Sequence, residues 1–163
     1  MSASSPSSSP ARIPGSLAPD KYSTERVTWI EAVNDHLFRF RTTRYPGFRF
    51  APGQFARLGV LRDDGDAGPR HVWRAYSIAS AAYDDFLEFY SIVVPDGEFT
   101  TRLAGLKVGD ELLIEKTSYG FLTTDRFPSG EQLWLLSSGT GLAPFMSILQ
   151  DLTVWTTYRK IVV

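Results

Sequence analysis

Between residues 21 and 124, apolar and polar positions alternate over short runs, a period of two that indicates pleated β-strands. Turn sequences rich in glycine and proline, such as "YPGFRFAPGQ" and "PDGE", separate the runs. Short strands at near-regular spacing are typical of a closed or nearly closed antiparallel barrel. The pattern predicts six strands, over residues 26–33, 37–42, 54–61, 74–79, 86–94 and 111–116.

After about residue 129 the pattern changes. The stretch "GEQLWLLSSGTGLAPFMSILQD" predicts a short apolar strand, a Gly/Ser turn and an amphipathic helix, as at the start of a nucleotide-binding α/β unit. Residues 158–163 predict the approach to a second parallel strand. One strand and one crossover cannot bury both faces of a parallel sheet. We therefore expect an all-β antiparallel barrel over residues 21–128, followed by an incomplete α/β unit with a parallel sheet over residues 129–163.

The ends and the composition narrow the class of protein. Residues 1–20 hold seven serines and four prolines without apolar periodicity, which predicts a disordered tail. The chain has no cysteine, which excludes a disulfide scaffold and a cysteine-ligated iron–sulfur cluster. No apolar run approaches the roughly 18–20 residues that cross a bilayer, and no apolar signal segment opens the chain. A cytoplasmic protein without a membrane partner is expected.

Arginines are concentrated in one part of the chain. Residues 39–74 contain eight arginines and three acidic residues, whereas the whole chain has a net charge of −1. This stretch predicts either a basic surface for an acidic partner or a phosphate group, or a solvated strand face. The sequence leaves both interpretations open.

The strand "HVWRAYSIAS", residues 71–80, has apolar and polar side chains on both of its faces. An ordinary half-buried strand would separate them, so both faces are expected to meet something other than core or water.

Two glycine turns are candidate anion sites. In "SSGTGLAPF", residues 137–145, glycines precede a helix with proline in its first turn, and such a turn either approaches a ligand closely or is purely structural. A third glycine of the dinucleotide fingerprint is missing. In "PDGEFTTRL", residues 95–103, a turn leads into a short helix.

No motif for hydrolytic or metal chemistry is present. His36 and His71 have no partnering serine motif, and we expect both at the surface. Any redox chemistry would therefore belong to a bound cofactor.

Taken together, "RAYSIAS", "LEFYSIVVPDGEFTTRL" and "LLSSGTGLAPFMSIL", in this order, resemble the bacterial ferredoxin/flavodoxin–NADP(H) reductases, which depend on FAD. The resemblance runs from about residue 22 to residue 163. The R-x-Y-S motif alone is shared with other flavin reductases, and the combined string is more specific.

The resemblance implies that Arg74 pairs with the FAD pyrophosphate, that Tyr76 packs on the isoalloxazine, and that the Ser77 hydroxyl lies near the flavin N5 atom. Tyr76 and Ser77 are then the catalytic residues. The residues implied to bind FAD or NADP(H) are Arg74, Ala75, Tyr76, Ser77, Tyr90, Ser91, Ile92, Val93, Glu98, Phe99, Thr100, Ser138, Gly139, Thr140 and Gly141.

The activity implied is hydride exchange between NADPH and the flavin, followed by one-electron exchange with ferredoxin or flavodoxin. These carriers are acidic, which fits the arginine-rich stretch. A monomer without nucleic acid is expected. The alternatives are a flavin-binding module without turnover and the reductase component of an oxygenase.

Overall fold

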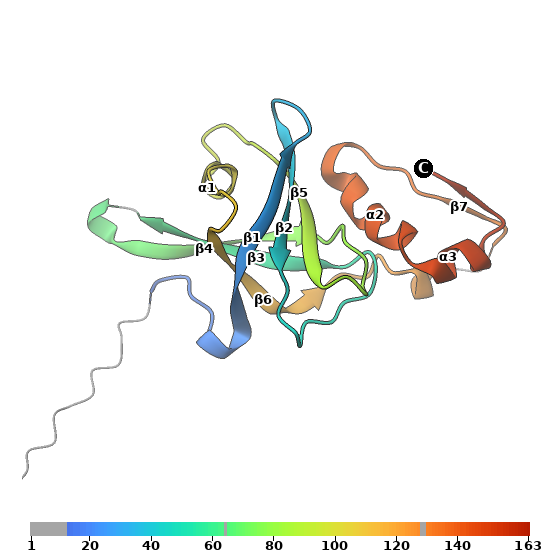
Figure 1. Ribbon diagram of the computed structural model, residues 1–163, viewed down its shortest axis with the longest axis horizontal. Helices are drawn as coiled ribbons and strands as arrows, with labels where there is room; N and C mark the ends of the chain where they lie inside the picture. Colours follow the sequence, from blue (N-terminus) through green and yellow to red (C-terminus); the bar gives the residue numbers. More distant parts are fainter. Residues whose placement is uncertain (1–12, 64, 128–129) are drawn as a thin grey trace, which may run out of the picture.

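The computed structural model describes residues 13–63, 65–127 and 130–163 (Figure 1). Six antiparallel strands form one sheet in the order β4-β3-β6-β1-β2-β5. Their bounds are β1 Tyr22–Ala32, β2 Leu37–Thr43, β3 Phe55–Asp63, β4 Pro69–Ser77, β5 Phe86–Ile92 and β6 Glu111–Tyr119.

The sheet curls so that its two edge strands meet. Beyond the end of β4, Ile78 forms an isolated antiparallel bridge with Phe89 of β5, and the Ala79 amide donates to the Glu88 carbonyl at 2.8 Å. The barrel is therefore joined at one point, without a continuous ladder between β4 and β5. The predicted antiparallel barrel is confirmed in this nearly closed form.

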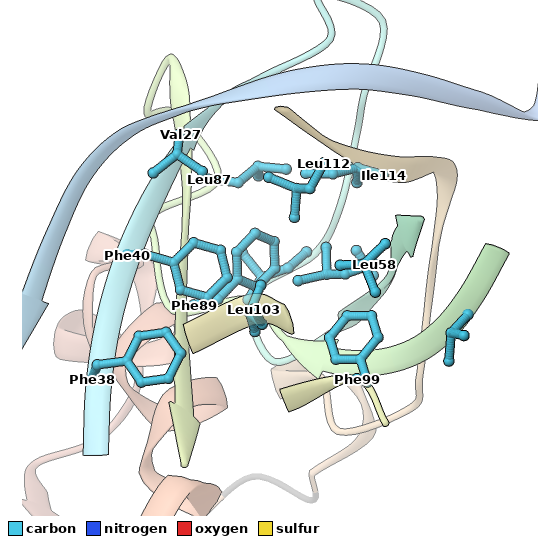
Figure 2. Close-up of a cluster of buried hydrophobic side chains, with 14 of the residues drawn as sticks. Val27, Phe38, Phe40, Leu58, Leu87, Phe89, Phe99, Leu103, Leu112 and Ile114 are labelled. Carbon is cyan, nitrogen blue, oxygen red and sulfur yellow. The ribbon is translucent and has the colours of Figure 1, made fainter. Parts of the chain in front are cut away.

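Alternation along the strands builds the core. In β2 the even positions Phe38, Phe40 and Thr42 are buried, while the odd positions are more exposed. Figure 2 shows the aromatic and aliphatic side chains of the barrel meeting in one cluster, in which the Phe40 and Phe89 ring centroids lie 5.5 Å apart. Phe99 and Leu103, from the segment of the short helix α1 (Thr100–Ala104), also join this cluster.

Replacement by valine is expected to change the stability of the protein in opposite directions at two adjacent threonines of β2. Within the described part of the chain, the fully buried Thr42 hydroxyl has no hydrogen-bond partner. Thr43 Oγ1 accepts from the Arg26 amide at 2.9 Å and donates to Glu25 Oε2 at 2.5 Å.

Because an unpaired buried hydroxyl costs about 1–3 kcal/mol, Thr42→Val should raise the free energy of unfolding by about 1 kcal/mol. Thr43→Val should lower it by a similar amount. Urea unfolding of both variants measures the two signs, and a loss of stability in Thr42→Val would contradict the expectation.

The second unit follows the barrel. Strands β7 (Gln132–Trp134) and β8 (Lys160–Val162) pair in parallel, and the helices α2 (Ala143–Leu149) and α3 (Leu152–Thr157) connect them (Figure 1). Its small core contains Leu133, Leu135, Ile148, Val154 and Tyr158. The predicted start of an α/β unit with a parallel sheet is thus confirmed. Large apolar side chains, including Trp134, Leu136 and Trp155, remain exposed on it.

Part of the predicted tail is seen to contact the barrel. Its first twelve residues lie outside the described residues. The Gly15 carbonyl accepts from Trp73 Nε1 at 3.0 Å, and Ser16 Oγ lies 2.8 Å from His71 Nδ1. Residues 14–16 therefore lie against β4, and a short 3-10 helix, Pro19–Lys21, leads into β1.

Six of the eight arginines of residues 39–74 make ion pairs with described residues, and Arg44 and Arg49 donate to main-chain carbonyls. Arg39 and Arg41 pair with Glu88, at 3.7 and 2.6 Å, and Arg57 pairs with Glu115 at 3.3 Å. A second group of arginines surrounds Glu98. Arg39 also pairs with Glu31 at 2.5 Å, so the acidic partners come from β1, β5, β6 and the turn before α1.

Among the described residues, no helix has both the length and the apolar character needed to cross a membrane.

Candidate functional site

A cavity of about 420 Å³ opens where β4, β5, the turn before α1 and the glycine loop of the second unit meet. Its walls are formed by Arg74, Ala75, Tyr76, Ser77, Tyr90, Ser91, Ile92, Val94, Gly97, Glu98, Phe99, Thr100, Thr140 and Ala143.

The end of β4 supplies one wall. The strand pairs with β3 as far as Ser77, and the chain then bridges to β5 through the buried Ile78. Because the chain passes from one edge strand to the other here, neighbouring residues of both strand faces reach the same cavity. This explains the mixed faces of the strand: Arg74 to Ser77 line the cavity, and Ile78 belongs to the core.

Tyr76 is held from three sides. Its hydroxyl lies 3.0 Å from Ser91 Oγ, and its ring centroid lies 5.5 Å from that of Phe99 and 6.4 Å from that of Phe89. Burial raises the pKa of the phenol above its ordinary value, while the Ser91 hydrogen bond and the charge of Arg74 act in the opposite direction. The tyrosine is therefore a neutral phenol at physiological pH, with a fixed aromatic ring.

Arg74 reaches the rim of the cavity. Its Nη1 donates to the Trp73 carbonyl at 2.8 Å, and its Nη2 lies 3.4 Å from Glu98 Oε2. These contacts fix the direction of the guanidinium, which has five N–H donors in all.

The turn between β5 and α1 is compact. Thr100 Oγ1 accepts from the Val94 amide at 3.2 Å and lies 3.3 Å from the Val94 carbonyl, so this hydroxyl closes the turn. A Cβ atom at Gly97 would collide with the Thr100 hydroxyl, so this position requires glycine.

The glycine loop forms a short 3-10 helix, Gly139–Leu142, that leads into α2. Gly139 has a φ of 56°, in the left-handed region that favours glycine. Thr140 and Ala143 line the cavity, whereas Ser138, Gly139 and Gly141 are exposed and outside its lining.

Two side chains of the second unit form hydrogen bonds with the main chain just after β4. The fully buried Ser147 donates its hydroxyl to the Ser80 carbonyl at 2.8 Å, and Gln150 Nε2 donates to the Ala79 carbonyl at 2.8 Å. These two side chains of the second unit set where Thr140 stands relative to β4.

Ser147→Ala should lower the free energy of unfolding by about 1–2 kcal/mol, because it leaves the buried Ser80 carbonyl without this donor. Thermal unfolding measures the loss. Thr156→Ala is the control, since its exposed hydroxyl bonds only within α3, to the Thr153 carbonyl, and it should change stability by less than about 0.5 kcal/mol. Equal effects of the two substitutions would contradict this role for Ser147.

The cavity brings together eleven of the fifteen residues singled out from the sequence. Val93 lies outside its lining, and its amide donates to the His36 carbonyl at 2.8 Å. Val94, Gly97 and Ala143 were not singled out, although all three lie within the quoted motifs.

Hydrolytic and metal chemistry have no support in the described residues. Ser16 contacts His71, and burial lowers the pKa of this imidazole. No group of His, Asp or Glu there could hold a metal ion.

The chain is similar in sequence to ferredoxin–NADP and flavodoxin/ferredoxin–NADP reductases. It is 50% identical over 139 residues to the ferredoxin–NADP reductase of Pseudomonas aeruginosa, in an alignment covering 85% of this chain and 52% of that protein. It is 40% identical over 149 residues to a flavodoxin/ferredoxin–NADP reductase of Rhodobacter capsulatus, covering 91% and 53% of the two chains. No protein-family model matches the chain.

Among solved structures, a ferredoxin–NADP+ reductase from Neisseria gonorrhoeae with bound FAD and NADP superposes with a TM-score of 0.80 at 35% identity, over 86% of this chain and 55% of that one. The chain thus spans about half the length of the relatives it matches. The resemblance inferred from the motifs is confirmed: over 85% or more of its length, this chain is a homologue of the ferredoxin/flavodoxin–NADP reductases.

Proposed function

We propose that this chain binds FAD in the cavity beside β4, and that it is the flavin-binding part of an FAD-dependent ferredoxin or flavodoxin–NADP(H) oxidoreductase. The observation that carries the proposal is the convergence of the R-x-Y-S strand, the turn before α1 and Thr140 on one cavity. Residues 21–128 are then the FAD-binding unit, and residues 129–163 contribute to the NADP(H) site.

The chemistry of the walls fits a flavin nucleotide. The Tyr76 ring offers an aromatic face, Phe99 and Ile92 offer apolar contacts, and Arg74 offers a fixed guanidinium fork for phosphate oxygens. An aromatic face and a cation two residues apart on one strand suit a molecule that carries a ring and a phosphate.

FAD would supply the redox chemistry that links a two-electron nicotinamide donor to a one-electron carrier. The residues of the chain position the reactants. Tyr76, whose ring is held by Ser91 and Phe99, would support the flavin ring, and Ser77 would offer the flavin a hydroxyl group. Thr140, which lines the cavity from the glycine loop, would orient the nicotinamide.

The electron carrier belongs to the same proposal. The relatives are named for ferredoxin or flavodoxin, both of them acidic partners of small contact area. The ion pairs of Arg39 and Arg41 with Glu88 weaken the argument for a basic docking surface on that side of the barrel. The monomeric state and the cytoplasmic location expected from the sequence are also part of the proposal.

The test is a visible absorption spectrum of the purified chain with added FAD, followed by NADPH without air. A bound flavin that bleaches with NADPH supports both cofactor sites. A bound flavin that bleaches with dithionite but ignores NADPH supports the alternative, a flavin-binding module without turnover. A folded chain that binds no FAD would contradict the proposal.

A further inference from the structure

Three arginines surround one carboxylate next to the cavity. Glu98 Oε1 lies 3.0 Å from Arg62 Nη1 and also contacts Arg70, while Glu98 Oε2 lies 3.4 Å from Arg74 Nη2. Glu98 and Arg74 line the cavity, whereas Arg62 and Arg70 lie outside its lining. We call these four residues the Glu98 cluster.

The Glu98 cluster continues one face of the hairpin that contains the cavity strand. Tyr76, Arg74 and Arg70 are separated by even numbers of residues along β4, so they share a face, and Arg62 of β3 stands directly opposite Arg70. Figure 1 shows this hairpin projecting from the barrel. The backbone of Arg70 lies roughly 13 Å beyond that of Arg74, at about 3.3 Å per residue, but the guanidinium groups of both reach the Glu98 carboxylate.

A structural role alone does not account well for this arrangement. Like charges directly opposite each other destabilise a strand pair, and the carboxylate of Glu98 relieves that repulsion. Yet Glu98 is also a cavity residue that contacts Arg74. It therefore ties the two outer arginines to the rim at which the phosphate end of a nucleotide is expected.

The size of the cavity also indicates that part of a dinucleotide would lie outside it, near Arg62 and Arg70. A volume of about 420 Å³ is at the small end for ligand pockets. A flavin dinucleotide carries a second phosphate, a ribose and an adenine beyond its mononucleotide half. With the ring at Tyr76, the second phosphate, which is bonded to the first through one oxygen, stands beside Arg74, where the guanidinium groups of Arg62 and Arg70 also reach Glu98. The ribose and adenine must then leave the cavity toward the hairpin.

We propose that Arg62 and Arg70 bind the adenylate phosphate of the dinucleotide, and that Glu98 is a positioning residue that holds their guanidinium groups toward the cavity. This inference rests on the proposed binding of FAD. It assigns the mononucleotide half to the cavity and the adenylate half to the hairpin outside it.

The experiment compares FAD with FMN, which lacks the adenylate half. Dissociation constants of both flavins are measured by fluorescence titration for the unchanged chain and for Arg62→Gln/Arg70→Gln. Loss of charge-assisted hydrogen bonds should weaken FAD binding about tenfold or more and leave FMN binding within about threefold. Arg26→Gln is the matched control, because Arg26 makes an exposed ion pair with Glu111 at 2.9 Å on another strand, and it should change neither constant.

A further variant addresses Glu98. Once its two outer partners are removed, this carboxylate could draw Arg74 away from the ligand. The triple variant Arg62→Gln/Arg70→Gln/Glu98→Gln removes that possibility. It should still lose more affinity for FAD than for FMN. Circular dichroism and thermal unfolding establish that each variant is folded.

The outcomes separate this inference from the proposed function. Equal losses for FAD and FMN in the triple variant, or no loss for FAD, overturn the inference while flavin binding stands. Failure of the unchanged chain to bind either flavin overturns both.

Discussion

Arg74→Ala is expected to lower the affinity of the chain for FAD about a hundredfold, equivalent to about 2.7 kcal/mol. The guanidinium of Arg74 is oriented at the cavity rim by the Trp73 carbonyl and by Glu98, and hydrogen bonds from such a group to phosphate are charge-assisted. Arg74→Lys keeps the charge without the fork, so it should recover about half of the loss in free energy. Titration of the apoprotein with FAD measures both variants.

The control is Arg102→Ala, which removes an exposed arginine of α1 that lies outside the cavity lining. It should leave the FAD dissociation constant within about twofold. If Arg74→Ala and Arg102→Ala changed the constant equally, a general loss of positive charge would explain the result, and the role assigned to Arg74 would be wrong.

Phe89→Ala is expected to lower the free energy of unfolding by about 4 kcal/mol, because the ring is fully buried and its removal leaves a cavity in the barrel core (Figure 2). Phe89 contacts Phe40 and Tyr76, and it forms the bridge with Ile78 where the barrel closes. The variant should therefore also loosen Tyr76. Urea unfolding measures the stability, and FAD titration measures the second effect.

Phe121→Ala provides the comparison for Phe89→Ala. Phe121 is 76% exposed, so its removal should cost less than about 1 kcal/mol. A loss below about 1.5 kcal/mol in Phe89→Ala would show that the core can collapse around the missing ring, and that the bridge to Ile78 does not depend on it.

Much of the barrel could be predicted from the sequence because apolar and polar residues alternate over short runs between clear turn sequences. In β2, for example, Phe38 and Phe40 face inward while Arg39 and Arg41 face outward, and a strand with this pattern has one favourable orientation. The helix α3 was not predicted. Its sequence is rich in β-branched threonine and valine, but Asp151 caps it by accepting from the Thr153 amide at 3.0 Å.

The candidate site was predictable where a motif is contiguous in sequence. Tyr76 and Ser77 stand in the R-x-Y-S strand, and both line the cavity. The partners of the arginines were not predictable, because Glu88, Glu98 and Glu115 come from elements far along the chain. Only the register of the folded strands decides which arginine meets which carboxylate.

The joint between barrel and second unit has an asymmetry with an evolutionary consequence. Ser147 and Gln150 supply side-chain donors, whereas Ala79 and Ser80 supply only main-chain carbonyls. Every residue has such a carbonyl, so only the α2 side of the joint must be encoded by particular side chains. A barrel from a homologous chain could therefore be recombined with this second unit, and the graft would keep both hydrogen bonds as long as small residues occupied the positions of Ala79 and Ser80.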